Sequence, residues 1–169
     1  MFEKGQVILY GNQGIFKVTG TEIQTFAGID SEYYVLEGIF ETQRKVYVPM
    51  KSPKLIEKMK PVLSRDEVEN LIDSIPNREN IWIDNENRRK EAFREILSSG
   101  NRGSLLDLIT TLSAHRTICR QNGRKMHQCD ERAYKEAEKL VYEEFCYVLD
   151  IPQQEIVGYI TNRVPAFAS

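Results

Sequence analysis

The residues whose chemistry stands out lie near the middle of the chain, where the only tryptophan, Trp82, precedes two adjacent arginines, Arg88 and Arg89. A large aromatic ring beside two guanidinium groups could press against the minor groove of a nucleic-acid duplex while the arginines hold phosphate groups. The same residues could also form an ordinary helix start with a buried tryptophan, because tryptophan is usually well buried. The local sequence is compatible with both interpretations.

The surrounding segment is the most basic part of the chain. Residues 77–129 contain 10 Lys or Arg against 6 Asp or Glu, a net charge of +4, whereas residues 1–76 carry −2 and residues 130–169 carry −4. Arginine suits two-pronged phosphate contact, although scattered arginines could equally keep helices soluble and pair with nearby glutamates. Because the whole chain carries a net charge of −2, we expect weak binding to free DNA. The basic side chains that could form such a surface are Arg88, Arg89, Arg94, Arg116, Arg120, Arg124, Lys125 and Arg132.

One group of residues could be a zinc site. His115 and Cys119 are four residues apart on a predicted helix, and His127 and Cys129 follow after a turn. Two nitrogen and two sulfur ligands suit zinc, but the second pair is separated by one residue instead of the usual two to four. We therefore expect a helix-end histidine and ordinary thiols, with no metal and no other cofactor.

The composition favours a cytoplasmic protein that is not an enzyme. No apolar run approaches the roughly 20 residues needed to span a bilayer, and the N-terminus lacks a basic and apolar signal segment. Three widely spaced cysteines do not indicate a disulfide framework. The chain has no Gly-Lys-Ser/Thr phosphate loop and no other catalytic set of residues that we recognise.

The elements that must position these residues differ between the two parts of the chain, which predicts an α+β fold. Residues 1–62 contain four or five short β-rich segments separated by tight turns, typical of a small SH3-like β-barrel. Gly20 is expected to mark a bulge. The segment Val46-Tyr47-Val48 ends at Pro49, and proline is confined to sheet edges or strand ends, so this strand is expected to border solvent or a partner.

Residues 63–169 are predicted to form an all-α domain. Ser64 and Glu67 have the spacing of a capping box. Apolar residues at helical spacing then predict several helices, the longest of them over residues 130–149. We expect a loose tail from Arg163 onward.

The order of these features resembles the RNA polymerase-interacting domain shared by CarD and CdnL regulators and the transcription-repair coupling factor. Trp82, the arginine pair, the helix end at 93–100 and the long helix resemble the helical domain of CarD/CdnL proteins, so the resemblance spans nearly the whole chain. The residues that carry the first part are Phe2-x-x-Gly5-x-Val7-x-x-Tyr10-x-x-x-Gly14, then Tyr33-Tyr34-Val35-Leu36, then Val46-Tyr47-Val48-Pro49.

The resemblance implies a Tudor-like β-barrel that binds the β subunit of bacterial RNA polymerase, with a helical domain that contacts promoter DNA at the upstream edge of the melted bubble. In that family a tryptophan wedges into the minor groove and helps to keep the open complex from closing. We therefore expect a monomer that associates with the nucleoid through polymerase. The implied polymerase-binding residues are Gln24, Lys45, Tyr47, Val48 and Pro49. The DNA-binding set consists of Trp82, Arg88, Arg89 and Arg132 from the resemblance, with Arg124 and Lys125 added from the basic segment.

Two departures from the family pattern leave alternatives open. The family's tryptophan commonly lies two residues before the arginine pair, whereas residues 83–87 intervene in this chain. Either Trp82 lies on a longer loop or it is not the equivalent wedge. Some members also use arginines on the barrel, where this chain has Gln24 and Tyr47. The alternative function is a protein–protein adaptor that binds polymerase or another partner without a DNA role.

Overall fold

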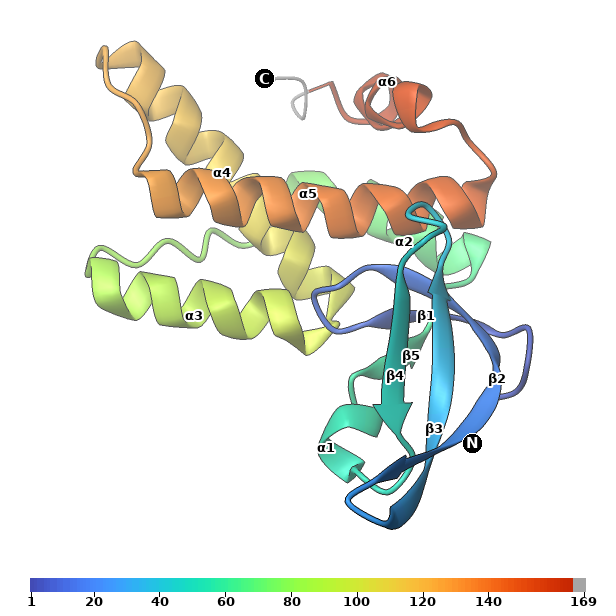
Figure 1. The fold of residues 1–169 in the computed structure, drawn as a ribbon. Coiled ribbons are helices and arrows are strands. Elements are labelled where there is room, and N and C mark those ends of the chain that lie inside the picture. The colour runs from blue at the N-terminus through green and yellow to red at the C-terminus, as the bar shows by residue number, and fades with distance from the viewer. Residues whose placement is uncertain (166–169) are drawn as a thin grey trace. The chain divides into compact units, whose positions relative to one another are not determined.

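A computed structural model describes residues 1–165. The chain divides into two compact units, Met1–Val62 and Leu63–Ser169. Figure 1 shows that the first unit is built mainly from strands and the second from helices. The mixed fold class predicted from the sequence is therefore present.

The N-terminal unit is an antiparallel sheet of five strands in the order β4-β3-β2-β1-β5. Within residues 1–62, β4 and β5 are the outer strands and do not pair with each other, so the sheet is open at the point where the predicted barrel would close. The elements are β1 (Val7–Tyr10), β2 (Ile15–Phe26), β3 (Ile29–Gly38), β4 (Lys45–Pro49), the short helix α1 (Pro53–Ile56) and β5 (Met59–Pro61).

Local sequence explains the shape of this sheet. The register between β2 and β3 shifts at Gly20, which confirms the predicted bulge. The two strands are joined by Ala27 and Gly28, both with positive φ, as a tight hairpin turn requires. Side chains alternate across the sheet, and Tyr34, Leu36 and Val48 point into the core of this unit.

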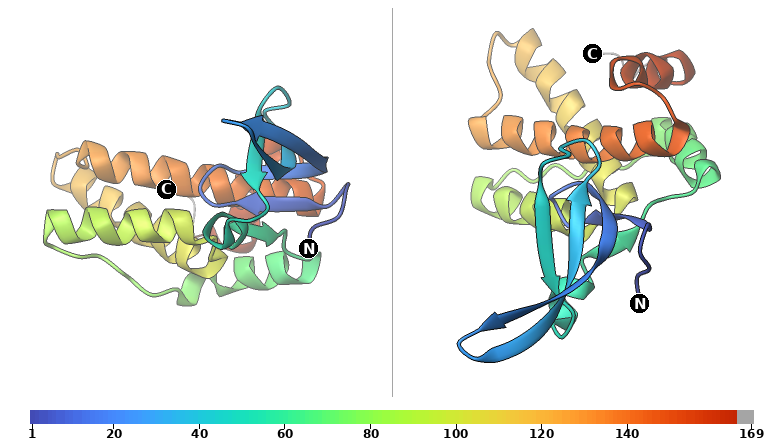
Figure 2. Two further views of the ribbon diagram at one scale, coloured as in Figure 1. Left: turned by 60° about the horizontal axis from the view of Figure 1, so that its bottom comes forward. Right: turned by 45° about the vertical axis from the view of Figure 1, so that its right-hand side comes forward.

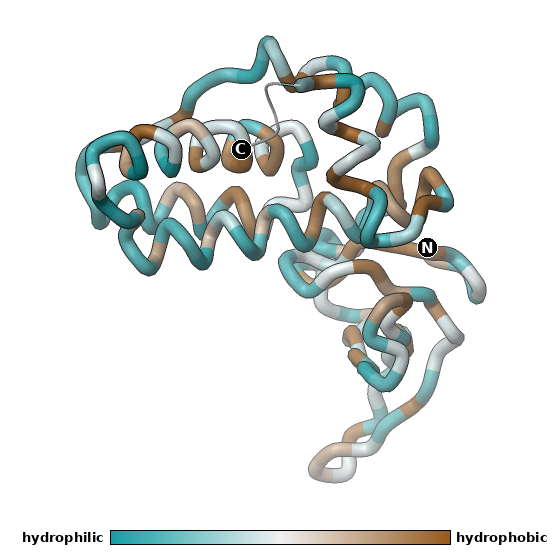
Figure 3. The backbone as a smooth tube through the Cα atoms, turned by 90° about the horizontal axis from the view of Figure 1, so that it is seen from above, coloured by the Kyte–Doolittle hydropathy of each residue, from teal (hydrophilic) through white to brown (hydrophobic). Residues whose placement is uncertain are grey.

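The second unit, as far as residue 165, contains five helices and a short 3₁₀ turn over Ile75–Asn77. Both hydrogen bonds of the predicted capping box are present: Glu67 N donates to Ser64 Oγ at 3.1 Å and Ser64 N donates to Glu67 Oε1 at 3.0 Å. Hydrophobic and hydrophilic stretches alternate along the helices in Figure 3, as amphipathic packing requires. The helices are α2 (Arg65–Ser74), α3 (Glu86–Ser99), α4 (Arg102–Gln121), α5 (Gln128–Leu149) and α6 (Gln153–Arg163).

A buried ion pair holds the start of α4 against α5. Arg102 donates from Nε to Glu144 Oε1 at 2.9 Å and from Nη2 to Oε2 at 2.8 Å, and both side chains are buried. Glu144 Oε2 also accepts from the backbone N–H of Leu63 at 3.0 Å. The first residue of the helical unit is therefore tied to its longest helix.

The end of the chain differs from the sequence prediction. Arg163 ends α6 and forms ion pairs with Glu69 and Asp73 of α2, and Val164 is buried. The prediction of a loose tail is wrong for these two residues, because the ion pairs and the core hold them. The last four residues of the predicted tail, 166–169, lie outside the described residues. Over the described part of the chain, the structure contains no helix with an apolar stretch long enough to cross a membrane.

Candidate DNA-contact and partner-binding sites

The loop between the 3₁₀ turn and α3 carries Trp82 and is fixed against α4. Arg78 donates from Nε to Asp107 Oδ1 at 2.7 Å. Ile81 donates its backbone N–H to Thr111 Oγ1 at 3.0 Å. These two contacts hold the loop on both sides of residue 80, so that the segment that follows has a defined path.

Trp82 is half-buried and its ring makes three contacts. The ring stacks on the imidazole of His115 from α4, with centroids 3.8 Å apart and planes inclined by 21°. The guanidinium carbon of Arg89 lies 4.3 Å from the ring centroid. The indole N–H donates to Asp84 Oδ1 at 3.1 Å. Trp82 is thus neither a fully buried core residue nor a freely exposed ring.

Arg89 is an interior residue, although the sequence suggested a phosphate contact. Its side chain is 2% exposed and forms a two-pronged ion pair with the buried Asp130 of α5, with N–O distances of 3.0 and 3.1 Å. Its remaining Nη1 donates to the backbone carbonyls of Ile83 at 3.0 Å and Asp84 at 3.3 Å. The expected phosphate contact therefore has no support at Arg89, because the guanidinium is enclosed and engaged inside the unit.

Arg88 is exposed, in contrast to its neighbour. Consecutive residues on an α-helix project about 100° apart, since one turn takes 3.6 residues. When Arg89 points into the bundle, Arg88 must therefore point away from that direction. Only one member of the arginine pair is available to a ligand in this structure.

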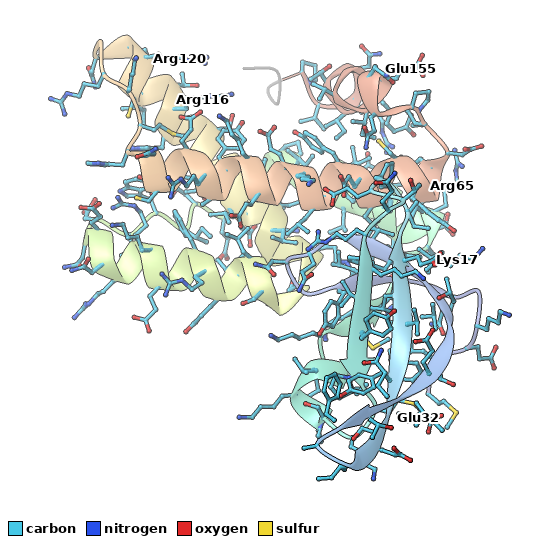
Figure 4. The ribbon with its side chains drawn as sticks, viewed as in Figure 1. Lys17, Glu32, Arg65, Arg116, Arg120 and Glu155 are labelled. Atoms are coloured by element: carbon cyan, nitrogen blue, oxygen red, sulfur yellow. The ribbon has the colours of Figure 1, made fainter. Side chains whose placement is uncertain are left out.

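The other expected DNA-contact residues are exposed around one end of the helical unit. Arg124 and Lys125 lie in the turn after α4, and Arg132 lies in the second turn of α5. Figures 1 and 2 show the beginnings of α3 and α5 and the end of α4 at the same end of this unit. Figure 4 shows Arg120, an exposed residue, in the last turn of α4. Arg89 is the arginine that contacts Trp82, and the DNA-contact role of the exposed basic residues at this end of the unit stays a prediction.

Arg116 makes a local contact within the unit. Its guanidinium carbon lies 4.6 Å from the ring centroid of Tyr134, and its Nη2 donates to the Tyr134 hydroxyl at 3.3 Å. This residue packs α4 against α5.

The four candidate zinc ligands are not gathered into one site. His115 Nε2 lies 3.4 Å from Cys119 Sγ, whereas His127 is exposed at the start of α5. Cys129 Sγ lies 4.0 Å from a carboxylate oxygen of Glu86. Among residues 1–165, no group of three or more His, Cys, Asp or Glu side chains is placed to hold a metal ion.

His115 prefers its neutral form. Burial lowers the pKa of its imidazole below the ordinary value of 6.5, and the nearby positive charges of Arg89 and His127 lower it further. The carboxylate of Asp130 opposes this shift. The neutral ring is the form that stacks on Trp82 near neutral pH.

Four of the five expected polymerase-binding residues share one face of the N-terminal sheet. Lys45, Tyr47 and Pro49 alternate along the outer strand β4. Tyr33 of β3 lies opposite Pro49 of β4 and opposite Glu22 of β2, so these three residues share a face. Gln24 is two residues after Glu22 on β2 and therefore lies on the same face. Tyr47 is 39% exposed.

Val48 points to the opposite face of β4 and is 0% exposed. Its side chain belongs to the core of the unit. The expectation that it contacts polymerase is therefore not supported for the side chain, because the period of two residues in a strand places Tyr47 and Val48 on opposite faces.

The tip of the β2–β3 hairpin carries two exposed apolar residues that were not among the expected polymerase-binding residues. Phe26 and Ile29 are directly opposite each other and are 63% and 68% exposed. Their register places them on the same face as Gln24. Figure 3 shows hydrophobic segments along this hairpin. The available signal was the pair of large apolar residues flanking the turn, which a hairpin tip must expose.

Comparison with protein families gives one match. Residues 2–60 match the family described as the CarD-like/TRCF RID domain. This range covers all five strands of the N-terminal unit except the last residue of β5. A search of curated proteins found no match.

Proposed function

We propose that this chain is a non-catalytic transcription regulator, because residues 2–60 match the family described as the CarD-like/TRCF RID domain. Its N-terminal sheet binds the β subunit of bacterial RNA polymerase. Its helical unit contacts promoter DNA at the upstream edge of the melted bubble and stabilises the open complex. It acts as a monomer in the cytoplasm, at promoters that polymerase has bound.

The outer strand β4 is the feature of the N-terminal unit that supports polymerase binding. An outer strand presents unpaired backbone N–H and C=O groups, to which a partner strand can add. Tyr47 and Pro49 flank that edge on the outward face, and Lys45 lies on the same face, where it pairs with Glu37 at 3.6 Å. An aromatic anchor beside a free strand edge suits a protein partner.

The exposed basic side chains at the end of the helical unit where α3 and α5 begin and α4 ends support the DNA contact. Arg88, Arg124, Lys125 and Arg132 are all exposed, and arginine and lysine hold phosphates without reading sequence. With a net charge of −2 on the whole chain, such a surface binds free DNA weakly. Binding to polymerase supplies the high local concentration that the DNA contact needs.

The single observation that carries the proposal is the family match over the sheet that presents β4. The experiment is the decay of open complexes formed by the cognate polymerase, measured with and without the protein after addition of a competitor. Trp82→Ala is expected to retain polymerase binding and to shorten the open-complex lifetime roughly fivefold or more, the scale of one lost aromatic–base contact. Tyr147→Ala, which removes another exposed aromatic from the helical unit, is the matched control and should leave the lifetime unchanged.

One observation favours the adaptor alternative. Arg89 is engaged inside the unit and the indole of Trp82 is packed on His115, so two of the expected DNA contacts are occupied by internal partners. An adaptor predicts that Arg88 and Lys125 can be replaced by alanine without any change in promoter footprints or in their dependence on salt. The DNA-contacting regulator predicts weaker footprints whose salt dependence is reduced.

A further inference from the structure

We propose that His115 and Arg89 are positioning residues for Trp82, which hold its indole ring in one orientation before the protein meets DNA. For its effect on transcription this inference rests on the proposed DNA contact of Trp82. The positioning itself is a property of the free protein and can be measured without DNA or polymerase.

The first contact is the stack on His115. A centroid distance of 3.8 Å with an inclination of 21° is close-packed contact between two rings. The imidazole is itself held, since its Nε2 lies 3.4 Å from the buried Cys119 Sγ one helical turn further along α4. His115 thus offers a fixed surface to one aromatic ring.

The second contact is made by Arg89, which joins three parts of the unit. Its guanidinium is locked by the buried ion pair with Asp130 of α5. The same group restrains the loop, because it donates to the carbonyls of Ile83 and Asp84 directly after Trp82. Its carbon lies 4.3 Å from the centroid of the indole, in cation–π range. One side chain therefore fixes the backbone that carries the tryptophan and also contacts its ring.

Two hydrogen bonds also hold Trp82 in place. The backbone N–H of Trp82 donates to Asn80 Oδ1 at 2.9 Å, and its indole N–H donates to Asp84 Oδ1 at 3.1 Å. Loop residues are otherwise among the most mobile in a protein. The ring nevertheless remains half-buried, so part of it is accessible to a ligand.

A pre-positioned side chain binds more tightly than a mobile one. A side chain that is ordered only on binding loses conformational entropy at that moment, and a ring that is already fixed avoids this loss. Release of the ring is therefore expected to shorten the open-complex lifetime roughly two- to tenfold, a smaller effect than removal of the ring itself.

The stack can be measured by fluorescence, because the chain has one tryptophan and two histidines. A protonated imidazole in contact with indole quenches its fluorescence, so acidification should quench the emission of Trp82 with a midpoint below pH 6.5. The groups that face His115 and influence this midpoint are Cys119 on α4, Trp82 on the loop, Arg89 on α3, and His127 and Asp130 at the start of α5.

The decisive variants are His115→Phe, His115→Ala and, as matched control, His127→Ala, measured in the whole chain. His115→Phe keeps an aromatic stack and should abolish the acid quenching while it preserves the open-complex lifetime. His115→Ala should abolish the quenching, increase the access of acrylamide to Trp82 and shorten the lifetime. His127→Ala should retain quenching and lifetime. In a Trp82→Ala background, His115→Ala should have no further effect on the lifetime.

Three outcomes overturn the proposal. Acid quenching that survives His115→Phe means that His115 is not the group whose protonation quenches Trp82, and the stack then loses its support in solution. A lifetime that is unchanged in His115→Ala but shortened in Trp82→Ala removes the positioning role and leaves the proposed DNA contact in place. A lifetime that is unchanged in Trp82→Ala removes the DNA contact, and with it any functional consequence of positioning, even where the fluorescence establishes the stack.

Discussion

Removal of Asp130 should show how much the ion pair with Arg89 contributes to the stability of the helical unit. Arg89 and Asp130 are 2% and 1% exposed. At this burial, water cannot replace the hydrogen bonds that the guanidinium would lose with its partner. In Asp130→Ala the arginine keeps its bonds to the carbonyls of Ile83 and Asp84 but loses both bonds to the carboxylate. A charged group then remains buried with half of its partners.

Breaking a buried pair by removal of one partner costs about 3–5 kcal/mol, because an uncompensated charge stays behind. Replacement of both partners by apolar residues costs much less. In Arg89→Leu/Asp130→Leu the main remaining loss is that of the two carbonyl contacts, about 1 kcal/mol each. We therefore expect the double variant to be more stable than Asp130→Ala, by about 1–3 kcal/mol on these figures.

The assay is urea unfolding followed by far-ultraviolet circular dichroism, which reports on the helices and is independent of the environment of Trp82. Arg88→Ala is the control on the adjacent exposed position and should change the free energy of unfolding by no more than about 0.5 kcal/mol. An Asp130→Ala variant that loses less than about 1 kcal/mol would refute the reasoning, since the pair would then be screened by water like a surface ion pair.

Three further predictions concern adjacent or matched residues. Tyr47→Ala should weaken binding of polymerase with little change in stability, whereas Val48→Ala should reduce the stability of the N-terminal unit by about 2 kcal/mol; pull-down with the β subunit and urea unfolding separate the two. Arg124→Ala and Lys125→Ala should each lower the slope of log affinity against log salt for the polymerase–promoter complex by about 1, the value for one lost phosphate contact, and unchanged slopes would argue for the adaptor. The lowered pKa of His115 means that its neutral form stabilises the fold fully above pH 6.5, and that this contribution is lost as pH falls through the folded-state pKa. The free energy of unfolding, measured from about pH 8 to 5, should therefore decline below pH 6.5. An equal decline in His115→Phe would show that His115 is not the cause.

Much of the fold follows from local sequence. The bulge at Gly20 and the capping box at Ser64 were predictable because each depends on residues within a few positions of one another. The outer position of β4 was predictable from Pro49, which cannot donate a hydrogen bond in the middle of a sheet. Closure of a barrel depends instead on pairing between distant strands, and the open order β4-β3-β2-β1-β5 could not be read from any single segment.

The candidate DNA site was predictable in composition but not in geometry. Trp82 and the basic residues around it were identified by their types, yet the sequence does not state that Arg89 pairs with a carboxylate 41 positions later. The helical period alone shows that Arg88 and Arg89 diverge, but not which of them faces the core. His115 was a candidate metal ligand by its type, and its stacking on Trp82 depends on the packing of a loop against α4.

The hydrogen bond from Leu63 to Glu144 limits where an expression fragment of the helical unit can begin. An expression fragment that begins at residue 64 or later lacks the N–H that Glu144 Oε2 accepts at 3.0 Å, beside the guanidinium of Arg102. A fragment that begins a few residues earlier, at Lys60, retains this donor as an ordinary peptide group. Crystallisation or binding work on the isolated helices should therefore start upstream of Leu63.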